Sequence, residues 1–194
     1  SLRRRQRQMC IRDRFMGESG YFVTYEQVDP LFSVDLSDPE KPKILGKLKI
    51  PGFSEYLHFY GEDRLLGIGM STDEESGVAE GVKITMFNIS DRSDVKEEST
   101  LVLDDLYGSH AAYDYKSVLA DPEKNVIGLS GYSQNGESYY LLTYNRTDRK
   151  FETILQEEVN GNTSQGIRGI YIEDTLYVIS GNIIEAYDMN TGVK

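Results

Sequence analysis

Apolar and polar residues alternate with a period of two along most of the chain from Gly20 onward. The alternating runs are short, rich in β-branched and aromatic residues, and separated by Gly, Asp, Asn and Pro. A period of two is typical of a strand with one buried face, and no long window keeps the ~3.6-residue period of an amphipathic helix. The pattern therefore predicts an all-β fold.

One feature of this pattern recurs four times: a strand ends in Asp or Asn, and a polar residue follows three positions later. The four end residues are Asp35, Asn88, Asn145 and Asp188, which lie 53, 57 and 43 residues apart. Repeats of about 40 to 50 residues are typical of propeller blades, each built from four antiparallel strands. A β-sandwich also has short strands, but it gives no reason for one motif to recur at such intervals. We therefore predict a β-propeller.

The repeat divides residues 15–194 into a partial propeller of about three to three and a half four-stranded antiparallel blades. We expect four strands, named a to d in chain order, in both the second and the third blade. The pattern shows no strand a in the first blade, and the fourth blade stops before strand d. The expected blades cover residues 20–51, 55–103, 113–159 and 166–194.

The first fourteen residues differ from the rest in composition. Ser1–Arg14 holds six of the 21 basic residues, one of the 32 acidic residues and the single cysteine, Cys10. This segment resembles the translated sequencing-adaptor read-through found at the broken ends of metagenomic gene fragments. We therefore expect residues 1–14 to be a non-native or disordered tail that packs against nothing, and the chain to be an interior piece of a longer protein. An arginine-rich targeting arm is the alternative.

Charge and hydropathy exclude several classes of protein. The formal net charge is -11 and the pI is near 4.7, without a basic stripe. We expect no nucleic-acid partner, because this charge repels phosphate backbones. A single cysteine excludes a disulfide framework and a zinc site made of several thiolates. The sequence has no run of about 20 apolar residues that would span a membrane.

No catalytic motif stands out. Neither His58 nor His110 accompanies the G-x-S-x-G motif of a nucleophile elbow. The acidic loop 72–76 lacks the D-x-[DN]-x-[DN]-G spacing of a calcium loop. Gly67 and Gly69 lie inside an expected strand with no helix after it, so we interpret them as allowing close packing between blades. The sequence therefore predicts no catalytic residue, no metal site and no cofactor.

The expected a strands carry one candidate binding feature. Strand a lines the central channel of a propeller, so residues at similar positions in successive a strands face the same space. His58, Lys116 and Arg168 occupy such positions in three blades. A ring of these side chains would be able to hold a carboxylate or phosphate group. The alternative is that each pairs with a neighbouring acid, such as Asp114 or Glu55, and ties blades together.

The stretch at residues 21–58, YFVTYEQVDPLFSVDLSDPEKPKILGKLKIPGFSEYLH, resembles the signature of secreted bacterial and archaeal proteins with a C-terminal β-propeller distantly related to Trp-Asp repeats. YDYKSVLADPEKN at residues 113–125 and IRGIYIEDTLYVIS at residues 167–180 resemble that family more loosely. Phe59 and Tyr115 stand where the family pattern has Pro and His. The resemblance implies an extracytoplasmic propeller, extracellular or at the cell surface, with a signal or anchor upstream, and it implies no particular activity.

We therefore expect an extracytoplasmic binding or interaction module whose partner is a protein or a small anionic ligand. The alternative is a hydrolase or lactonase-like propeller enzyme whose active face lies partly outside this chain. Carboxylates or histidines that converge at one mouth of the channel would favour an enzyme, whereas an exposed aromatic or apolar patch would favour a binding module.

Overall fold

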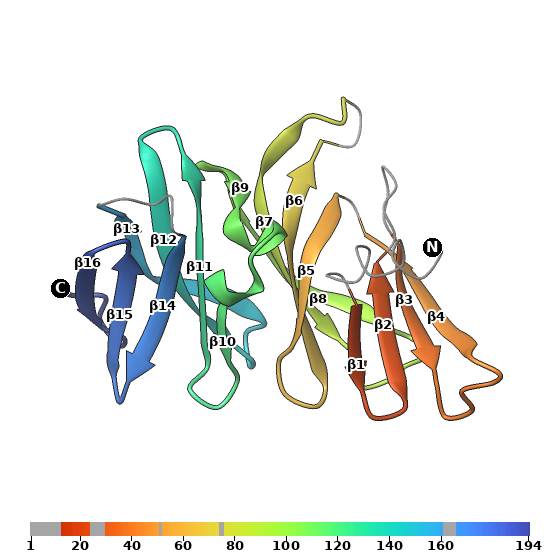
Figure 1. The fold of residues 1–194 in the computed structure, drawn as a ribbon. Helices are drawn as coiled ribbons and strands as arrows, with labels where there is room; N and C mark the ends of the chain where they lie inside the picture. The colour runs from red at the N-terminus through yellow and green to blue at the C-terminus, as the bar shows by residue number, and fades with distance from the viewer. Residues whose placement is uncertain (1–12, 24–29, 51, 74–75, 161–165) are drawn as a thin grey trace, which may run out of the picture. The chain divides into compact units, whose positions relative to one another are not determined.

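The computed structural model describes residues 13–23, 30–50, 52–73, 76–160 and 166–194. Within these ranges almost every element is a strand, and sixteen strands form four sheets (Figure 1). In each sheet, strands that follow one another in the chain lie side by side, apart from one extra strand in the third sheet. No helix among the described residues is long and apolar enough to cross a membrane. The all-β propeller architecture predicted from the sequence is confirmed.

The chain divides into two compact units, Ser1–Val102 and Leu103–Lys194. The first unit holds two four-stranded sheets, each in chain order. The first sheet contains β1 (Asp13–Met16), β2 (Ser19–Val23), β3 (Pro30–Asp35) and β4 (Lys43–Lys49). The second contains β5 (Phe53–Phe59), β6 (Arg64–Thr72), β7 (Ala79–Asn88) and β8 (Lys96–Leu103), which ends one residue into the second unit.

The second unit holds a five-stranded and a three-stranded sheet. The third sheet contains β10 (Leu119–Asp121), β11 (Val126–Ser133), β12 (Gly136–Asn145) and β13 (Lys150–Glu158), with β9 (Leu106–Ser109) paired to the end of β11. Two single turns of 3-10 helix, η4 (His110–Ala112) and η5 (Tyr115–Ser117), follow β9. The fourth sheet contains β14 (Ile167–Ile172), β15 (Thr175–Ser180) and β16 (Ile183–Asp188).

Each of the four repeat residues ends the third strand in the meander of its sheet and makes the same hydrogen bond. Its Oδ1 atom accepts from the main-chain N–H two residues later, at 2.9 Å for Asp35, 3.0 Å for Asn88, 3.0 Å for Asn145 and 2.9 Å for Asp188. Short polar side chains favour such Asx turns because they replace a main-chain acceptor. The repeat seen in the sequence is therefore the turn that follows strand c.

A main-chain hydrogen bond links this turn to the turn between the first two strands in three of the sheets. The N–H after the repeat residue donates to a carbonyl at 2.7 to 2.9 Å, in the pairs Leu36–Glu18, Ile89–Asp63 and Met189–Asp174. The bond joins two turns at the same end of each sheet, and it identifies β1, β5 and β14 as equivalent first strands.

The first sheet corrects two expectations about the start of the chain. The predicted first blade lacked strand a, but β1 supplies it, with Asp13 opposite Phe22 and Arg14 opposite Tyr21. The predicted tail boundary at Arg14 is therefore wrong for Asp13 and Arg14, which pair in the sheet. Their charges made them look like the tail, although main-chain pairing sets no requirement on side-chain charge at a strand end. Residues 1–12 lie outside the described residues.

The third blade corrects a predicted strand. Lys116 was expected to lie on strand a of this blade, but η5 covers Tyr115–Ser117 and β10 begins only at Leu119. Asp114 causes the difference: its side chain accepts from the Lys116 N–H at 3.0 Å, and its carbonyl accepts from the Ser117 N–H at 3.0 Å. Such a capping residue favours a helical turn over an extended strand.

Each unit has its own apolar core. In the first unit, buried side chains of β2, β3, β5, β6 and β7 meet, and in the second the core lies between the third and fourth sheets. Tyr139 illustrates how closely these two sheets pack, because a Cβ atom added at Gly128 of its own sheet or at Gly169 of β14 would overlap its hydroxyl group. At Gly67 of β6 the close approach is within one sheet, because an added Cβ atom would lie 2.9 Å from the Phe87 ring on β7.

We predict that Gly169→Ala destabilises the protein by about 1 to 3 kcal/mol, because the added methyl group overpacks a closed core. Gly108→Ala is the matched control, since its new Cβ atom would meet nothing closer than 3.7 Å. Urea unfolding of both variants measures the difference. Equal free energies of unfolding would show that the contact between Gly169 and Tyr139 does not limit the packing of the two sheets.

Candidate functional site

His58, the first residue of the predicted basic ring, lies half-buried on β5 in the first unit. The hydroxyl group of Tyr56 and Nδ1 of His58 are hydrogen-bonded at 2.9 Å, and the two rings stack with centroids 6.0 Å apart. The guanidinium of Arg14 lies 4.9 Å from the centroid of the Tyr56 ring. Burial, and then the charge of Arg14, lowers the pKa of His58, so that the imidazole is neutral at neutral pH.

Lys116 on η5 and Arg168 on β14 belong to the second unit, and each contacts Asp114, the residue directly before η5. Arg168 Nη2 lies 3.9 Å from Asp114 Oδ2, and the Lys116 main-chain N–H donates to Asp114 Oδ1. The Lys116 side chain is exposed, with Nζ 5.8 Å from the Tyr115 ring centroid. Exposed pairs of this kind contribute little to stability. His58 belongs to the other unit, and the anion-binding ring of the three residues stays a prediction.

The lowered pKa of His58 predicts a pH dependence of stability. The unfolded chain binds a proton at this residue near pH 6.5, whereas the folded chain binds it only at lower pH, so the free energy of unfolding falls as the pH drops from 7.5 to 5. His58→Gln removes this contribution while it keeps a polar side chain. Urea unfolding at pH 7.5 and at pH 5 should therefore show a smaller loss for His58→Gln than for the wild type. An equal loss would mean that His58 titrates alike in both states.

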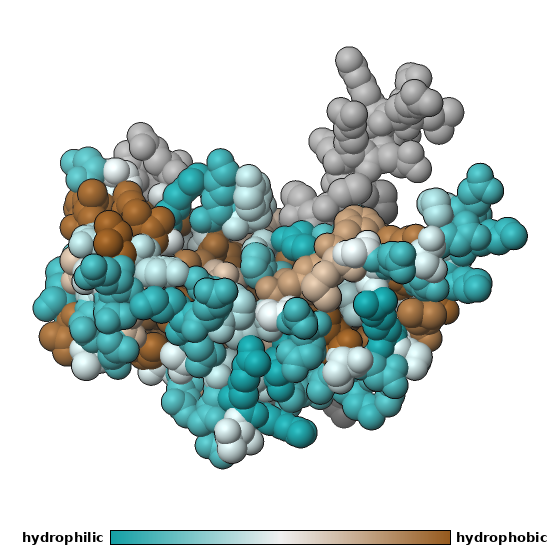
Figure 2. All heavy atoms as spheres, turned by 90° about the horizontal axis from the view of Figure 1, so that it is seen from below, coloured by the Kyte–Doolittle hydropathy of each residue, from teal (hydrophilic) through white to brown (hydrophobic). Residues whose placement is uncertain are grey.

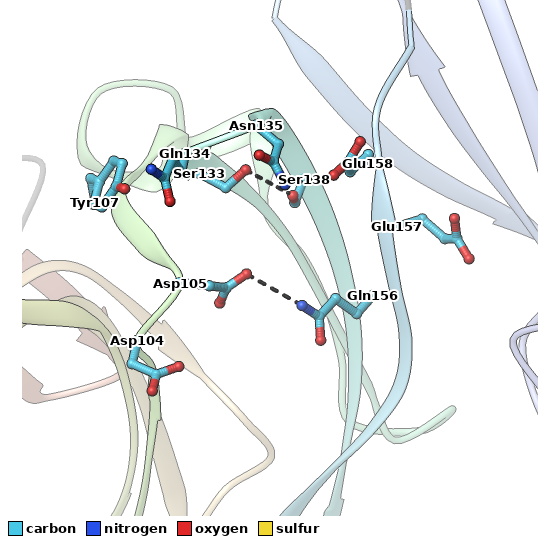
Figure 3. Close-up of a pocket in the computed structure, with 10 residues that line it drawn as sticks. All are labelled: Asp104, Asp105, Tyr107, Ser133, Gln134, Asn135, Ser138, Gln156, Glu157 and Glu158. Carbon is cyan, nitrogen blue, oxygen red and sulfur yellow. Dashed lines mark hydrogen bonds between the residues drawn. The ribbon is translucent and has the colours of Figure 1, made fainter.

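A cavity of about 610 Å³ opens in the second unit. Figure 3 shows its side chains, which come from residues 104–107, the β11–β12 turn, β12 and β13; Asp105 faces Gln156, whereas Glu157 points away from the others. The lining residues share polar character, with one aromatic ring among them. They are Asp104, Asp105, Tyr107, Ser133, Gln134, Asn135, Ser138, Gln156, Glu157 and Glu158, and we call this cavity the acidic pocket.

Hydrogen bonds hold the polar groups of the acidic pocket in place. Asp105 accepts from the hydroxyl of Tyr140 at 2.5 Å and from Gln156 Nε2 at 3.3 Å (Figure 3 draws the second bond). Glu158 accepts from Asn135 Nδ2 at 3.1 Å. Burial, and then the bond to Asp105, raises the pKa of Tyr140, so the phenol remains a donor to the carboxylate. The site is thus ordered before any ligand arrives.

The electrostatics of the acidic pocket favour a positive ligand. Its lining contains four carboxylates and no lysine, arginine or histidine. These carboxylates are spread around the cavity, and the described part of the chain contains no group of three or more His, Cys, Asp or Glu side chains that could hold a metal ion. The arrangement therefore suits an organic cation with separated charges better than a single metal ion.

A second polar cluster lies around His110 in the same unit. His110 is 4% exposed, and the rings of Tyr113 and Tyr132 pack against it with centroids 5.6 and 4.6 Å away. The two tyrosine hydroxyl groups hydrogen-bond to each other. Both tyrosines are exposed to solvent on their other side, with relative exposures of 57% and 37%. No sequence motif marks this cluster, because its members come from separate elements.

Residues 104–118 build much of both clusters. This connection from β8 to β10 includes β9, η4 and η5, whereas residues 50–52 alone connect β4 to β5. It carries three exposed tyrosines, Tyr107, Tyr113 and Tyr115, and the predicted blade pattern left most of it unassigned. Insertions between repeats often form the binding face of a repeat protein. This excess length was the signal in the sequence that could have located the site.

The surface of the molecule gives no comparably built alternative among the described residues. Hydrophilic residues cover most of the face drawn in Figure 2, with hydrophobic residues in separate patches. The fourth sheet exposes Ile170, Ile172 and Ile184, which do not line the acidic pocket. Ile170 lies opposite Tyr177 and Ile184 lies opposite Ile179, so the exposed isoleucines share one face of that sheet.

Successive four-stranded meanders with equivalent turns define a β-propeller. Residues 11–192 match the family model described as Beta propeller domain, and the chain belongs to this family. The match begins before Arg14, in agreement with the pairing of β1. The relation to Trp-Asp repeats implied by the sequence resemblance stays a prediction.

Two curated archaeal proteins are similar to this chain. An uncharacterized protein of Archaeoglobus fulgidus is 40% identical over 181 residues, which are 93% of this chain and 26% of that protein. The uncharacterized protein MJ1554 of Methanocaldococcus jannaschii is 35% identical over 177 residues, 91% of this chain and 26% of that protein. The chain thus spans about a quarter of the length of these relatives.

Solved structures share the fold. Sqt1 of Saccharomyces cerevisiae superimposes with a TM-score of 0.59 at 15% identity, covering 90% of this chain and 42% of that one. A protein from Lactobacillus plantarum superimposes with a TM-score of 0.56 at 14% identity, covering 88% of this chain and 50% of that one. At such low identity these similarities support the fold alone.

Proposed function

We propose that this chain is part of a binding module that works outside the cytoplasm and takes a cationic ligand in the acidic pocket of its second unit. One observation carries the proposal: a cavity of about 610 Å³ is lined by four carboxylates and by no basic residue. Tyr107, which is 63% exposed at the rim, adds an aromatic face that attracts cations. The extracytoplasmic location rests on the sequence resemblance.

The pocket is suited to recognition because hydrogen bonds already order its side chains, so binding a ligand costs them little conformational entropy. Tyr140 is 2% exposed and holds Asp105, while Asn135 holds Glu158. A ligand therefore immobilises few side chains when it binds, which improves affinity. A polyamine, or the lysine and arginine side chains of a partner protein, has the separated positive charges that these carboxylates would match.

We predict that spermidine binds to the full chain and that Asp105→Asn or Glu158→Gln weakens this binding several-fold, because each change removes one carboxylate charge from the pocket. Isothermal titration calorimetry at low salt measures the affinity, which should fall as salt is added. Glu123→Gln is the matched control, since it removes an equal charge from an exposed turn outside the pocket. Equal affinities in all four proteins would contradict the proposal.

A second candidate function is anion binding by Lys116 and Arg168, and the geometry around Asp114 supports it in part. Arg168 Nη2 and the Lys116 main-chain N–H both lie near the Asp114 carboxylate, and the Arg168–Asp114 distance of 3.9 Å leaves the guanidinium only loosely paired. Phosphate or citrate would compete with Asp114 for Arg168, and the positive charge of Lys116 would attract the same anion.

For this second function, we expect Lys116→Ala/Arg168→Ala to reduce citrate affinity about tenfold or more, because it removes both positive charges from the site. Titration calorimetry with citrate compares this variant with the wild type. The control is Lys43→Ala/Lys47→Ala, which removes two charges from β4 in the first unit. Negligible citrate binding by the wild type would leave Arg168 and Asp114 as a structural pair only.

A further inference from the structure

Three side chains form a line in the second unit next to Tyr113 and Tyr132, with Ser130 and His110 buried and the Glu137 side chain 15% exposed. Ser130 Oγ on β11 lies 3.0 Å from His110 Nδ1, and His110 Nε2 lies 3.4 Å from Glu137 Oε2 on β12. Ser130 is completely buried. A serine, an imidazole and a carboxylate in this order are the arrangement of nucleophilic catalysis, which is recognised by geometry and not by the order of residues in the chain.

The two neighbours of His110 favour one tautomer of its neutral form. A carboxylate offers no hydrogen, so the tautomer with the hydrogen on Nε2, which lies 3.4 Å from Glu137 Oε2, is favoured electrostatically and leaves Nδ1 as the acceptor for Ser130. In that tautomer, Ser130 donates its hydroxyl hydrogen to Nδ1, which lies 3.0 Å away. The serine proton is thus already directed at a base.

Glu137 has a feature that a purely structural hydrogen-bond network does not explain. Its Oε2 atom is buried and has no hydrogen-bond partner among the described residues, although His110 Nε2 stands at ion-pair distance. An unsatisfied buried carboxylate oxygen costs free energy. Positive charge on the imidazole compensates that cost, and such charge develops when His110 takes the proton of Ser130. Glu137 therefore stabilises the charged state of a general base.

Access to Ser130 depends on the tyrosine pair. Tyr113 and Tyr132 contact the His110 ring, bond to each other through their hydroxyl groups and face solvent. Tyr113 lies in the short connection between η4 and η5, outside any strand. A change of its side-chain rotamer would open a path toward His110 without breaking a sheet, and side-chain rotamers of exposed residues change rapidly.

We propose that Ser130, His110 and Glu137 form a catalytic triad that hydrolyses small carboxylic esters. Ser130 Oγ attacks the ester carbonyl carbon while its proton passes to His110 Nδ1. The imidazolium, stabilised by Glu137, gives that proton to the leaving alkoxide, so the alcohol departs and the acyl group stays on Oγ. A water molecule then loses a proton to Nδ1 and attacks the acyl carbon, which releases the acid as Oγ recovers its hydrogen.

This activity is distinct from cation binding in the acidic pocket. Tyr132 and Glu137 are paired across the β11–β12 hairpin, and Ser130 points to the same face as Tyr132 because side chains alternate along a strand. Ser133 and Ser138, which line the acidic pocket, belong to the opposite face of the same two strands. Loss of either function therefore leaves the other testable.

The experiment treats the full chain with a fluorophosphonate, which reacts only with an activated serine, and locates the adduct by mass spectrometry. We expect the label on Ser130, no label in Ser130→Ala, and at least about tenfold slower labelling in Glu137→Gln. Ser117→Ala is the control for a buried serine, because Ser117 is 1% exposed and donates to the Asp114 carbonyl.

Tyr113→Ala tests the access route. It also keeps the triad testable if Ser130 of the wild type is labelled too slowly to detect. It should label Ser130 at least about tenfold faster than the wild type, whereas Tyr115→Ala, which removes a neighbouring exposed tyrosine, should not. Hydrolysis of p-nitrophenyl acetate should follow the same order. If Ser130 carries no adduct in either the wild type or Tyr113→Ala, while circular dichroism shows both folded, the triad is overturned and the three side chains serve only to hold η4 against β11 and β12.

Discussion

The hydrogen bond from a side-chain oxygen to the main chain after each third strand sets the register of the whole protein. It occurs at Asp35, Asn88, Asn145 and Asp188, always with the N–H two residues later. Side chains alternate along a strand, so a shift of one residue at this turn would exchange the buried and exposed faces of the following strand. The turn thus determines which side chains enter the core between neighbouring sheets. The alternation of apolar and polar residues in the sequence matches the register that this turn sets.

The fold was predictable as far as its determinants are local. Both partners of each Asx turn lie within two residues, so the repeat could be read directly from the sequence. The link between Leu36 and Glu18 joins main-chain groups and has no side-chain signature, which explains why β1 was missed. The competition at Asp114 between a strand and a capped turn depends on a hydrogen bond of ordinary strength, and local propensity alone did not decide it.

The sites were less predictable because their contacts are distant in the chain. Asp105 and Gln156 are 51 residues apart, and His110 and Ser130 are 20 residues apart. No spacing rule connects such pairs, which meet only once the strands have paired. The basic residues chosen from the sequence illustrate the same limit, since their predicted positions assumed a strand where η5 carries Lys116. What the sequence did contain was the long connection 104–118, of which residues 104–112 were assigned to no blade.

One hairpin serves both polar clusters, and this arrangement has a consequence for how they depend on each other. The register that places Tyr132 opposite Glu137 also places Ser133 opposite Gly136, with a two-residue turn between β11 and β12. A slip of one residue would send Tyr132 and Glu137 to the face of the acidic pocket and remove them from His110. The pocket and the His110 cluster therefore require the same turn geometry, even without a hydrogen bond between their charged groups. A substitution of a side chain in one cluster can leave the other intact, whereas a change in the hairpin register would disrupt both.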